Sequence, residues 1–379
     1  MFIPSVESKF LFTADNHIKS RTWTNSMLLH SDAYAALNAA SAWLTDKYQE
    51  QIQTLVIGGD WFDTDRPTAE DMLQSVEFLK RFHTVYYIRG NHDKKDPSFL
   101  ELMKYMPDVD LVNLEGTTVF LTEDMKTAMT GINYTDSADD LKAKIQLCHD
   151  QAKSQNVETL YLVLHTSFKH LLNFGTSKLE IRDIEALFPD MVVRVLVGDV
   201  HTRDTVNICE CNGSYIHSPG STYPTSIDKT AEEPAMSIIP VTGTQIEDIP
   251  CQVRMYWRVE YIDRSDLDST VDAAMDAQVE GFLPPFIRVL LPEGKELKLL
   301  QSDYPDVVVQ VTKMTADGGE VSEIKNRTAH ESYTLQQAVS DEASEDADLR
   351  DLAVALLETD DPVAEIDRWL EFWKVERLA

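Results

Sequence analysis

Five short apolar stretches of this chain each stop abruptly at residues that can bind metal or carry protons. One of them, Val85-Tyr86-Tyr87, runs directly into Ile88-Arg89-Gly90-Asn91-His92-Asp93. A buried strand that ends in this way delivers polar side chains to a loop at its carboxyl end, where open α/β sheets place their sites. Because Gly and Asn are also ordinary turn residues, this loop alone fits a turn as well as a site. The other stretches decide between the two.

The remaining four stretches end in the same manner. Residues 9–14 lead to Asp15-Asn16-His17, residues 54–57 to Gly58-Gly59-Asp60, residues 160–164 to His165, and residues 193–197 to Gly198-Asp199-Val200-His201. Helical patterns at about 32–48 and 68–82 separate the first three strands. This alternation of strand, loop and helix predicts a largely parallel sheet with right-handed crossovers.

The pattern changes after residue 201. Segments 204–210, 214–217 and 236–240 alternate apolar and polar residues, which predicts a second, antiparallel sheet. Two sheets packed face to face would form an α/β sandwich flanked by helices. We expect this main domain to cover residues 1–255, followed by a small α/β domain at 256–315, a linker at 316–332 and an acidic helical region at 333–379. Apolar stripes in the last region, such as Leu349, Leu352 and Leu356, fit either packing within this chain or binding to a partner.

The formal charge of −30 argues against a simple nucleic-acid binder, because affinity for phosphate comes from clustered Lys and Arg. If DNA is the substrate, metal ions or a partner must supply positive charge. Only four cysteines occur in 379 residues, which fits a reducing compartment. With no secretory signal pattern and no apolar run of about twenty residues, we expect a cytoplasmic protein without a membrane span.

The strand ends together supply carboxylate, amide and imidazole groups, and no thiolate. Any one of them could be a helix cap or a turn residue, but five converging segments favour a site. Such a donor set selects Mn²⁺, Mg²⁺ or Fe²⁺ rather than a structural zinc site. The Asp-x-His spacing of Asp15 and His17 puts alternate side chains on one side of an extended strand end, so that both can reach one ion.

These segments resemble the calcineurin-like metallophosphoesterases, whose pattern is Asp-x-His, Gly-Asp, Gly-Asn-His-Asp/Glu, His and Gly-His-x-His. Within that superfamily, three features are most similar to the SbcD-type DNA repair nucleases and their bacteriophage relatives, the recombination endonuclease subunits. They are the Gly-Asp-x-Phe form of the second motif, Asp93 at the end of the third, and Tyr215 followed by Pro219-Gly220-Ser221. The motifs span residues 15 to 221. The later regions match that family only in order and size.

The resemblance implies roles for nine residues. One metal would be bound by Asp15, His17, Asp60 and His201, and a second by Asp60, Asn91, His165 and Asp199, with Asp60 bridging. His92 would lie near the scissile phosphate and stabilise the transition state or protonate the leaving oxygen, with Asp93 orienting it. Two divalent ions, Mn²⁺ foremost and Mg²⁺ as the alternative, are the implied cofactors.

Two residues depart from the family pattern. Asp199 stands where the family usually has His, and the added negative charge should favour a hard ion while making the second metal less Lewis-acidic. Asp63 stands where many SbcD-type members have a second histidine near the substrate, which bears on the expectation of exonuclease action.

The resulting expectation is a manganese-dependent DNA nuclease subunit for repair, recombination or replication. By resemblance it would form a homodimer and bind an SbcC-type coiled-coil ATPase through its C-terminal helices, in the host cytoplasm if phage-encoded. One alternative is a small-molecule phosphomonoesterase or cyclic-nucleotide phosphodiesterase on the same core, which explains the acidity without a partner. Another, prompted by Asp199, is an assembly subunit with a weakened metal site.

Overall fold

A computed structural model describes most of the first 314 residues of the chain. The chain divides into two compact units, 1–323 and 324–379, and every described residue belongs to the first. The expected linker at 316–332, apart from residues 320 and 321, and the expected acidic helical region at 333–379 lie outside the described residues. The described residues are 9–19, 32–48, 51–93, 97–105, 109–169, 178–209, 213–224, 234–261, 263–279, 282–292, 294–295, 297, 304, 306–314 and 320–321.

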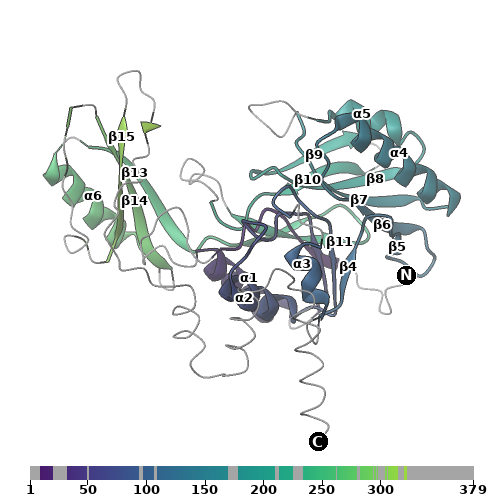
Figure 1. Cartoon of the computed structure of the whole chain (residues 1–379), viewed down its shortest axis with the longest axis horizontal. Coiled ribbons are helices and arrows are strands. Elements are labelled where there is room, and N and C mark those ends of the chain that lie inside the picture. The colour runs from purple at the N-terminus through teal and green to yellow at the C-terminus, as the bar shows by residue number, and fades with distance from the viewer. Residues whose placement is uncertain are drawn as a thin grey trace, which may run out of the picture. The chain divides into compact units, whose positions relative to one another are not determined.

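Two six-stranded mixed sheets form the main body (Figure 1). In spatial order, the first contains β12 (Glu247–Pro250), β11 (Ala235–Pro240), β1 (Lys9–Thr13), β2 (Thr54–Ile57), β3 (Thr84–Tyr87) and β4 (Leu111–Asn113). The second contains β5 (Val119–Phe120), β6 (Thr127–Ile132), β7 (Thr159–His165), β8 (Val192–Gly198), β10 (Ser214–Pro219) and β9 (Arg203–Cys209). The α/β fold with two sheets flanked by helices is confirmed.

The division of strands between the sheets differs from the expectation. Strands β1 to β4 pair in parallel, as predicted, but β6, β7, β8 and β10 form a second parallel set. The expected separate antiparallel sheet is therefore wrong, because β9 joins β10 whereas β11 crosses to the first sheet and pairs antiparallel with β1. Alternation along a strand shows that one face is buried but does not identify the neighbouring strand.

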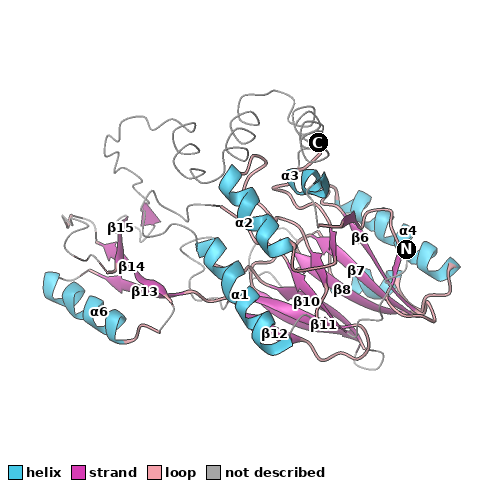
Figure 2. Ribbon diagram, turned by 90° about the horizontal axis from the view of Figure 1, so that it is seen from below, coloured by secondary structure: helices cyan, strands magenta, loops and turns pink. Residues whose placement is uncertain are grey.

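Helices cover the outer face of each sheet (Figure 2). Helices α1 (Asp32–Tyr48) and α2 (Ala69–Leu79) pack on the first sheet, and α4 (Ala138–Ser154) and α5 (Ile181–Leu187) on the second. Phe12, Val56, Tyr161 and Leu196 belong to the apolar layer between the sheets. The short α3 (Phe99–Leu102) continues as a 3₁₀ turn, η2 (Met103–Tyr105).

The helix starts follow local sequence. Thr68 caps α2 in a capping box with Asp71, and Ser98 caps α3 with Glu101. Ser137 accepts a hydrogen bond from the Asp140 backbone N–H at the start of α4. Capping of this kind satisfies N–H groups that have no partner inside the helix, so it fixes where each helix begins.

A third, four-stranded sheet follows residue 253. It contains β13 (Arg254–Glu260), β14 (Leu283–Leu291), β15 (Val308–Met314) and β16 (Glu320–Val321), with α6 (Arg264–Asp276) packed on it. Arg254 is fully buried, and its Nη2 lies 2.6 Å from Oδ1 of the equally buried Asp32 at the start of α1. The Tyr256 hydroxyl donates to the same carboxylate at 3.1 Å. No helix among the described residues is long and apolar enough to cross a membrane.

Candidate metal centre

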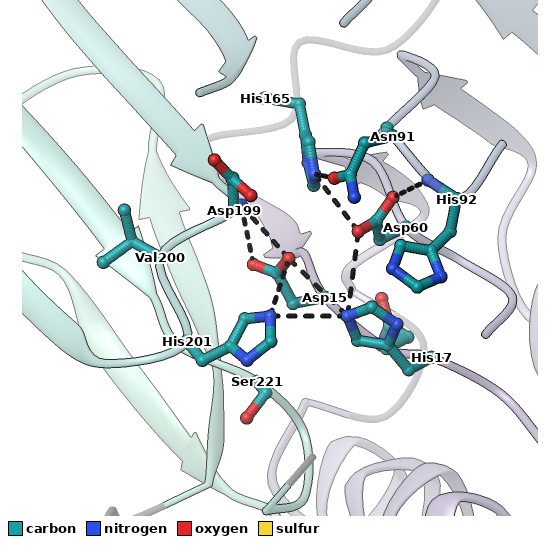
Figure 3. A network of polar contacts seen from close by, with 12 residues as sticks. Asp15, His17, Asp60, Asn91, His92, His165, Asp199, Val200, His201 and Ser221 are labelled. Atoms are coloured by element: carbon teal, nitrogen blue, oxygen red, sulfur yellow. Dashed lines mark hydrogen bonds and ion pairs between the residues drawn. The ribbon is translucent and has the colours of Figure 1, made fainter. Parts of the chain in front are cut away.

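The predicted site residues converge at the carboxyl ends of five strands drawn from both sheets (Figure 3). Asp15 and His17 follow β1, Asp60 follows β2, Asn91 and His92 follow β3, His165 ends β7, and Asp199 and His201 follow β8. The register places His165 beside Gly198 across the β7–β8 pair, which brings these two strand ends to the same level. The topology of two adjacent parallel sets thus assembles one site from residues up to 186 positions apart.

A first group of donor atoms comes from Asp15, His17 and His201, which lie within 4.8 Å of one another. The His17 Nε2 atom is 3.4 Å from His201 Nε2 and 4.0 Å from Asp15 Oδ1. His201 Nε2 is 3.5 Å from the same Asp15 oxygen. Two imidazole nitrogens and a carboxylate oxygen facing one point are a donor set suited to a divalent cation.

A second group comes from Asp15, Asp60 and His165, all of them buried. His165 Nε2 lies 3.3 Å from Asp60 Oδ2 and 2.9 Å from Asn91 Oδ1. The same Asp60 oxygen is 3.7 Å from His17 Nε2, so it lies between the two groups, as Figure 3 shows. Asp60 therefore contacts an imidazole from each of the two groups.

Asp199 contributes differently from the other predicted ligands. Its backbone N–H donates to both oxygens of Asp15, at 3.1 and 3.0 Å. Its carboxylate belongs to none of the donor groups found among the described residues. Burial raises the pKa of Asp199, and the carboxylates of Asp15 and Asp60 add to this effect against the opposing charge of His165. The local field therefore disfavours a further negative charge at this position.

The other buried carboxylates are stabilised in their charged forms by imidazoles. Burial alone would raise the pKa of Asp60, but the charge and hydrogen bond of His165, together with the charge of His17, hold it well below its usual range. Burial also acts to raise the pKa of Asp15, but the neighbouring imidazoles, chiefly the hydrogen bond and charge of His201, outweigh burial and lower this pKa. Burial lowers the pKa of His165, yet Asp60, Asp15 and Asp199 raise it to about 10. Such a field attracts cations strongly.

Four of the site residues have left-handed backbone conformations although none is glycine. The φ angles are 51° at Asp15, 40° at His17, 50° at Asp60 and 75° at Asp199. A non-glycine residue in this region costs of the order of 1 kcal/mol or more, and such residues cluster at functional sites. The backbone at these strand ends is therefore strained in the conformation that directs these side chains.

Three glycines allow the loops to pack tightly around the site. A Cβ atom on Gly90 would lie 2.1 Å from Asp60 Oδ1, and one on Gly59 would lie 2.4 Å from His165 Nδ1. A Cβ on Gly198 would lie 2.3 Å from the Gly58 carbonyl oxygen. Each contact is shorter than atoms tolerate, so glycine is required for close approach of the backbone.

His92 and Asp93 occupy the expected loop, but the contact that orients His92 differs from the expectation. His92 Nδ1 lies 2.5 Å from the backbone carbonyl oxygen of Asp63, and the His92 backbone N–H donates to Asp60 Oδ1 at 2.8 Å. Asp93 Oδ2 instead accepts the Gly90 N–H at 3.1 Å. Asp93 thus braces the loop, and burial raises its pKa to about 6.

Asp63 has a larger part in the site than its sequence position suggested. Its Oδ1 atom lies 3.5 Å from His17 Nδ1 and 3.1 Å from Lys19 Nζ. A carboxylate on the second nitrogen of a metal-ligating imidazole fixes the tautomer and ring orientation. The pattern Gly59-Asp60-Trp61-Phe62-Asp63 was the available signal, because a second carboxylate follows the first by three residues.

A further contact joins the site to the segment that follows β10. The Tyr223 hydroxyl donates to the His17 carbonyl oxygen at 2.7 Å, and Tyr223 is fully buried. An open pocket of about 470 Å³ borders the site and is lined by Asp63, Thr64, Asp65, Asn91 and His92. The pocket lies on the His92 side of the centre.

These donor groups fit divalent cations. Asp15, His17, Asp60 and His165 are buried with their donor atoms close together, and the carboxylates repel one another unless positive charge lies between them. The groups consist of oxygen and nitrogen atoms only, which suits hard or borderline ions. The clustered donors are therefore consistent with the binding of divalent metal ions.

Residues 8–209 match the model of the calcineurin-like phosphoesterase family. The match covers more than half of the chain and all five motif segments, so the chain belongs to this family. The residues that converge here are thus candidate metal ligands of a calcineurin-like phosphoesterase.

Similarity to individual proteins is more distant. The chain is 26% identical over 252 residues to the DNA double-strand break repair protein Mre11 of Methanosarcina acetivorans, a match that covers 64% of this chain and 38% of that protein. For the protein of the same name from Methanosarcina mazei, the identity is 26% over 314 residues, with 80% and 44% covered. The chain spans less than half the length of these relatives.

Two solved structures match the chain at low similarity. TT1561 of Thermus thermophilus is 12% identical with a TM-score of 0.42, covering 65% of this chain and 99% of that one. The 5′-nucleotidase from Candida albicans is 14% identical with a TM-score of 0.39, covering 66% and 53%.

Proposed function

We propose that this chain is a metal-dependent nuclease subunit that hydrolyses DNA phosphodiester bonds. The observation that carries the proposal is the position of Asp60, whose Oδ2 atom faces His165 at 3.3 Å and His17 at 3.7 Å and so connects two cation sites. A shared carboxylate between two ions is the arrangement that phosphodiester hydrolysis uses. The relatives named as DNA double-strand break repair proteins support DNA as the substrate.

Each ion would have its own set of ligands. Asp15, His17, Asp60 and His201 would hold the first, and Asp60, Asn91, His165 and Asp199 the second. Mn²⁺ is the proposed cofactor, with Mg²⁺ as the alternative, because oxygen donors prefer hard ions. When bound, two such ions lower the pKa of a water molecule and neutralise charge on the phosphoryl oxygens.

His92 would act on the substrate rather than on the metals. Its Nδ1 atom contacts the Asp63 carbonyl oxygen. Nε2 is therefore the nitrogen that would face a substrate in the bordering pocket. A protonated His92 held in this way can donate its Nε2 proton to the leaving oxygen. Asp93 would support this step indirectly, since it holds Gly90 and with it the loop that carries His92.

The regions that follow the main domain would cap the site and bind a partner protein. We propose that the small sheet from Arg254 onward is a capping domain, and that residues 333–379 bind an SbcC-type coiled-coil ATPase. Such a partner would supply the basic DNA-binding surface that a chain of charge −30 lacks. A homodimer and a bacteriophage origin remain parts of this proposal.

The test uses linear duplex and single-stranded DNA, labelled at one end, with the purified chain and Mn²⁺. Cleavage is expected with Mn²⁺ and none with EDTA, and Asp60→Asn should remove it. Nitrophenyl phosphate monoesters and diesters are assayed in parallel. Efficient hydrolysis of monoesters with no cleavage of DNA would contradict the proposal and favour a small-molecule phosphoesterase.

Asp199 supports a second candidate, an assembly subunit whose second metal site is weakened. Its carboxylate lies outside the donor groups of the described residues, and nearby carboxylates raise its pKa. Isothermal titration with Mn²⁺ distinguishes the two, because the nuclease should bind two ions per chain. A stoichiometry of one, together with intact ATPase binding, would identify the assembly subunit.

A further inference from the structure

A lysine lies beside the second group of donors, and an aromatic ring holds it there. Tyr134 lies two residues beyond the end of β6, and its ring centre is 6.1 Å from that of His165 in an edge-to-face arrangement. Its backbone N–H donates to the Arg89 carbonyl oxygen at 2.8 Å, which ties it to the loop that begins at Gly90. The Lys178 Nζ atom lies 4.0 Å from the Tyr134 ring centre.

Two contacts with uncharged groups help to place the Lys178 ammonium. One is the face of the Tyr134 ring, a cation–π contact. The other is a hydrogen bond to the Thr135 carbonyl oxygen at 2.7 Å. Both contacts attract a cation without cancelling its charge. The Tyr134 hydroxyl is itself fixed, since it donates to Asp136 Oδ1 at 2.7 Å.

The location of this cation is informative because its surroundings are strongly acidic. Lys178 Nζ is close to the Tyr134 ring, and that ring is close to His165, so Nζ lies at most about 10 Å from the His165 ring centre. This distance is about one Debye length at 0.1 M salt. Metals bound at the centre would neutralise the cleaved phosphate. A second phosphate on the same strand would approach a centre rich in carboxylates, so a positive charge beside it would favour its binding.

We propose that Lys178, positioned by Tyr134, contacts the phosphate next to the cleaved one and so makes the site selective for polynucleotides over small phosphate esters. This inference rests on the proposed nuclease function and adds a substrate-selecting residue to it. A monoester has no second phosphate to occupy this position. The sequence pattern did not single out either residue, because neither belongs to a strand-end motif.

The experiment compares the Mn²⁺-loaded wild type with Lys178→Gln on single-stranded oligothymidylate and on bis(4-nitrophenyl) phosphate. For the variant, kcat/KM for the oligonucleotide relative to that for the small diester should fall about fivefold to tenfold, mainly through KM. The slope of log affinity against log salt, measured with Ca²⁺ by fluorescence anisotropy, should become shallower by about 0.7. Equal losses on both substrates would overturn the inference.

A substrate-side change identifies the phosphate. A single neutral methylphosphonate is moved along the oligonucleotide, one linkage at a time. In the wild type, one linkage beside the cleaved bond should weaken binding, and Lys178→Gln should be insensitive at that linkage, so that the two effects are not additive. Additive effects at every linkage would overturn the assignment.

Two further variants serve as controls. Lys126→Gln removes one positive charge at the opposite end of β6, where Lys126 pairs with Glu158 at 2.8 Å, and it should leave all values as in the wild type. Tyr134→Leu should reproduce the loss seen in Lys178→Gln, whereas Tyr134→Phe, which keeps the ring, should retain most of the selectivity. If the wild type hydrolyses neither substrate, the nuclease proposal itself fails. Hydrolysis of both with unaltered selectivity in Lys178→Gln overturns only this inference.

Discussion

The Nδ1 atom of His165 lies 2.8 Å from the carbonyl oxygen of Gly58, so the imidazole is held by the backbone that follows β2 in the other sheet. This contact directs Nε2 toward Asp60 Oδ2 at 3.3 Å. Since Nδ1–H donates to the carbonyl oxygen, a metal would bind at Nε2 and displace a proton from it. The carboxylates around His165 raise its pKa to about 10, so this proton is present at neutral pH in the metal-free protein.

Metal binding should therefore release a proton and strengthen with pH. Affinity for Mn²⁺ should rise about tenfold per pH unit between about pH 7 and 9, because one proton leaves for each ion bound at His165. Titration calorimetry in two buffers of different ionisation enthalpy measures the released proton. Binding enthalpies that are the same in both buffers would contradict the protonated state of His165.

The same pKa predicts how the metal-free fold responds to pH. The folded-state pKa of about 10 exceeds the unfolded value of about 6.5, so the contribution of His165 to stability is complete below about pH 6.5. It should be lost as pH rises toward about 10. Urea denaturation of EDTA-treated protein across this range checks the decline, and His165→Gln should flatten it. A wild-type curve that rises through the same range would contradict the sign.

Replacing Asp60 and His92 should separate metal binding from bond breaking. Asp60→Asn should abolish Mn²⁺-dependent cleavage and weaken both metal sites, because Asp60 lies between them. His92→Asn should lower kcat at least about a hundredfold and keep metal stoichiometry, if His92 acts on the substrate as proposed. Circular dichroism confirms that each variant is folded. Cleavage at the wild-type rate by either variant would refute the assignment.

The close approach of Gly90 to Asp60 should make this glycine essential for metal affinity. Gly90→Ala places a methyl group where Asp60 Oδ1 lies, so the carboxylate must shift. Mn²⁺ affinity should fall about 10- to 100-fold, as it does when a group that supports a ligand is lost. Gly116→Asn is the matched control, because its added side chain meets open space and Asn tolerates the φ of +72° there.

Asp199 should govern which metal is preferred. Asp199→His removes a carboxylate from a position where Asp15 and Asp60 already raise its pKa. The ratio of Zn²⁺ to Mn²⁺ affinity should increase about tenfold, because imidazole suits the softer ion. Competition binding with the two metals measures the ratio. An unchanged ratio would indicate that residue 199 does not face the second ion.

The buried pair of Asp32 and Arg254 should contribute strongly to folding. Removing one partner, as in Asp32→Leu, takes away the carboxylate that neutralises the buried Arg254 and should lower the free energy of unfolding by about 3–5 kcal/mol. The double variant Asp32→Leu with Arg254→Met should recover a large part of this loss. A double variant as unstable as the two single losses added together would show that the pair is not coupled.

The sequence predicted the strand ends well because each motif follows an apolar run whose burial is unambiguous. Asp15, His17, Asp60, Asn91, His165 and His201 all reach the centre, and α1 begins at Asp32 where an acidic residue can start a helix. These features depend on local pattern alone. Local pattern is the part of a fold that a single sequence carries most directly.

Three features depended on information that a residue pattern does not contain. The pairing of β11 with β1 joins strands more than 220 residues apart, and alternation along β11 fits either sheet. Asp63 holds His92 through its backbone carbonyl, a group that every residue possesses. Lys178 lies near His165 because it contacts the Tyr134 ring, and Tyr134 follows β6, the strand that pairs with β7.

The interior position of β1 in its sheet sets an order of events during synthesis. β1 pairs with β2 on one side and with β11 on the other, and Asp15 and His17 follow it directly. A nascent chain that ends before residue 235 leaves one edge of β1 unpaired, although every predicted metal ligand has already been made. The metal centre should therefore mature abruptly, when β11 leaves the ribosome and completes the sheet beneath it.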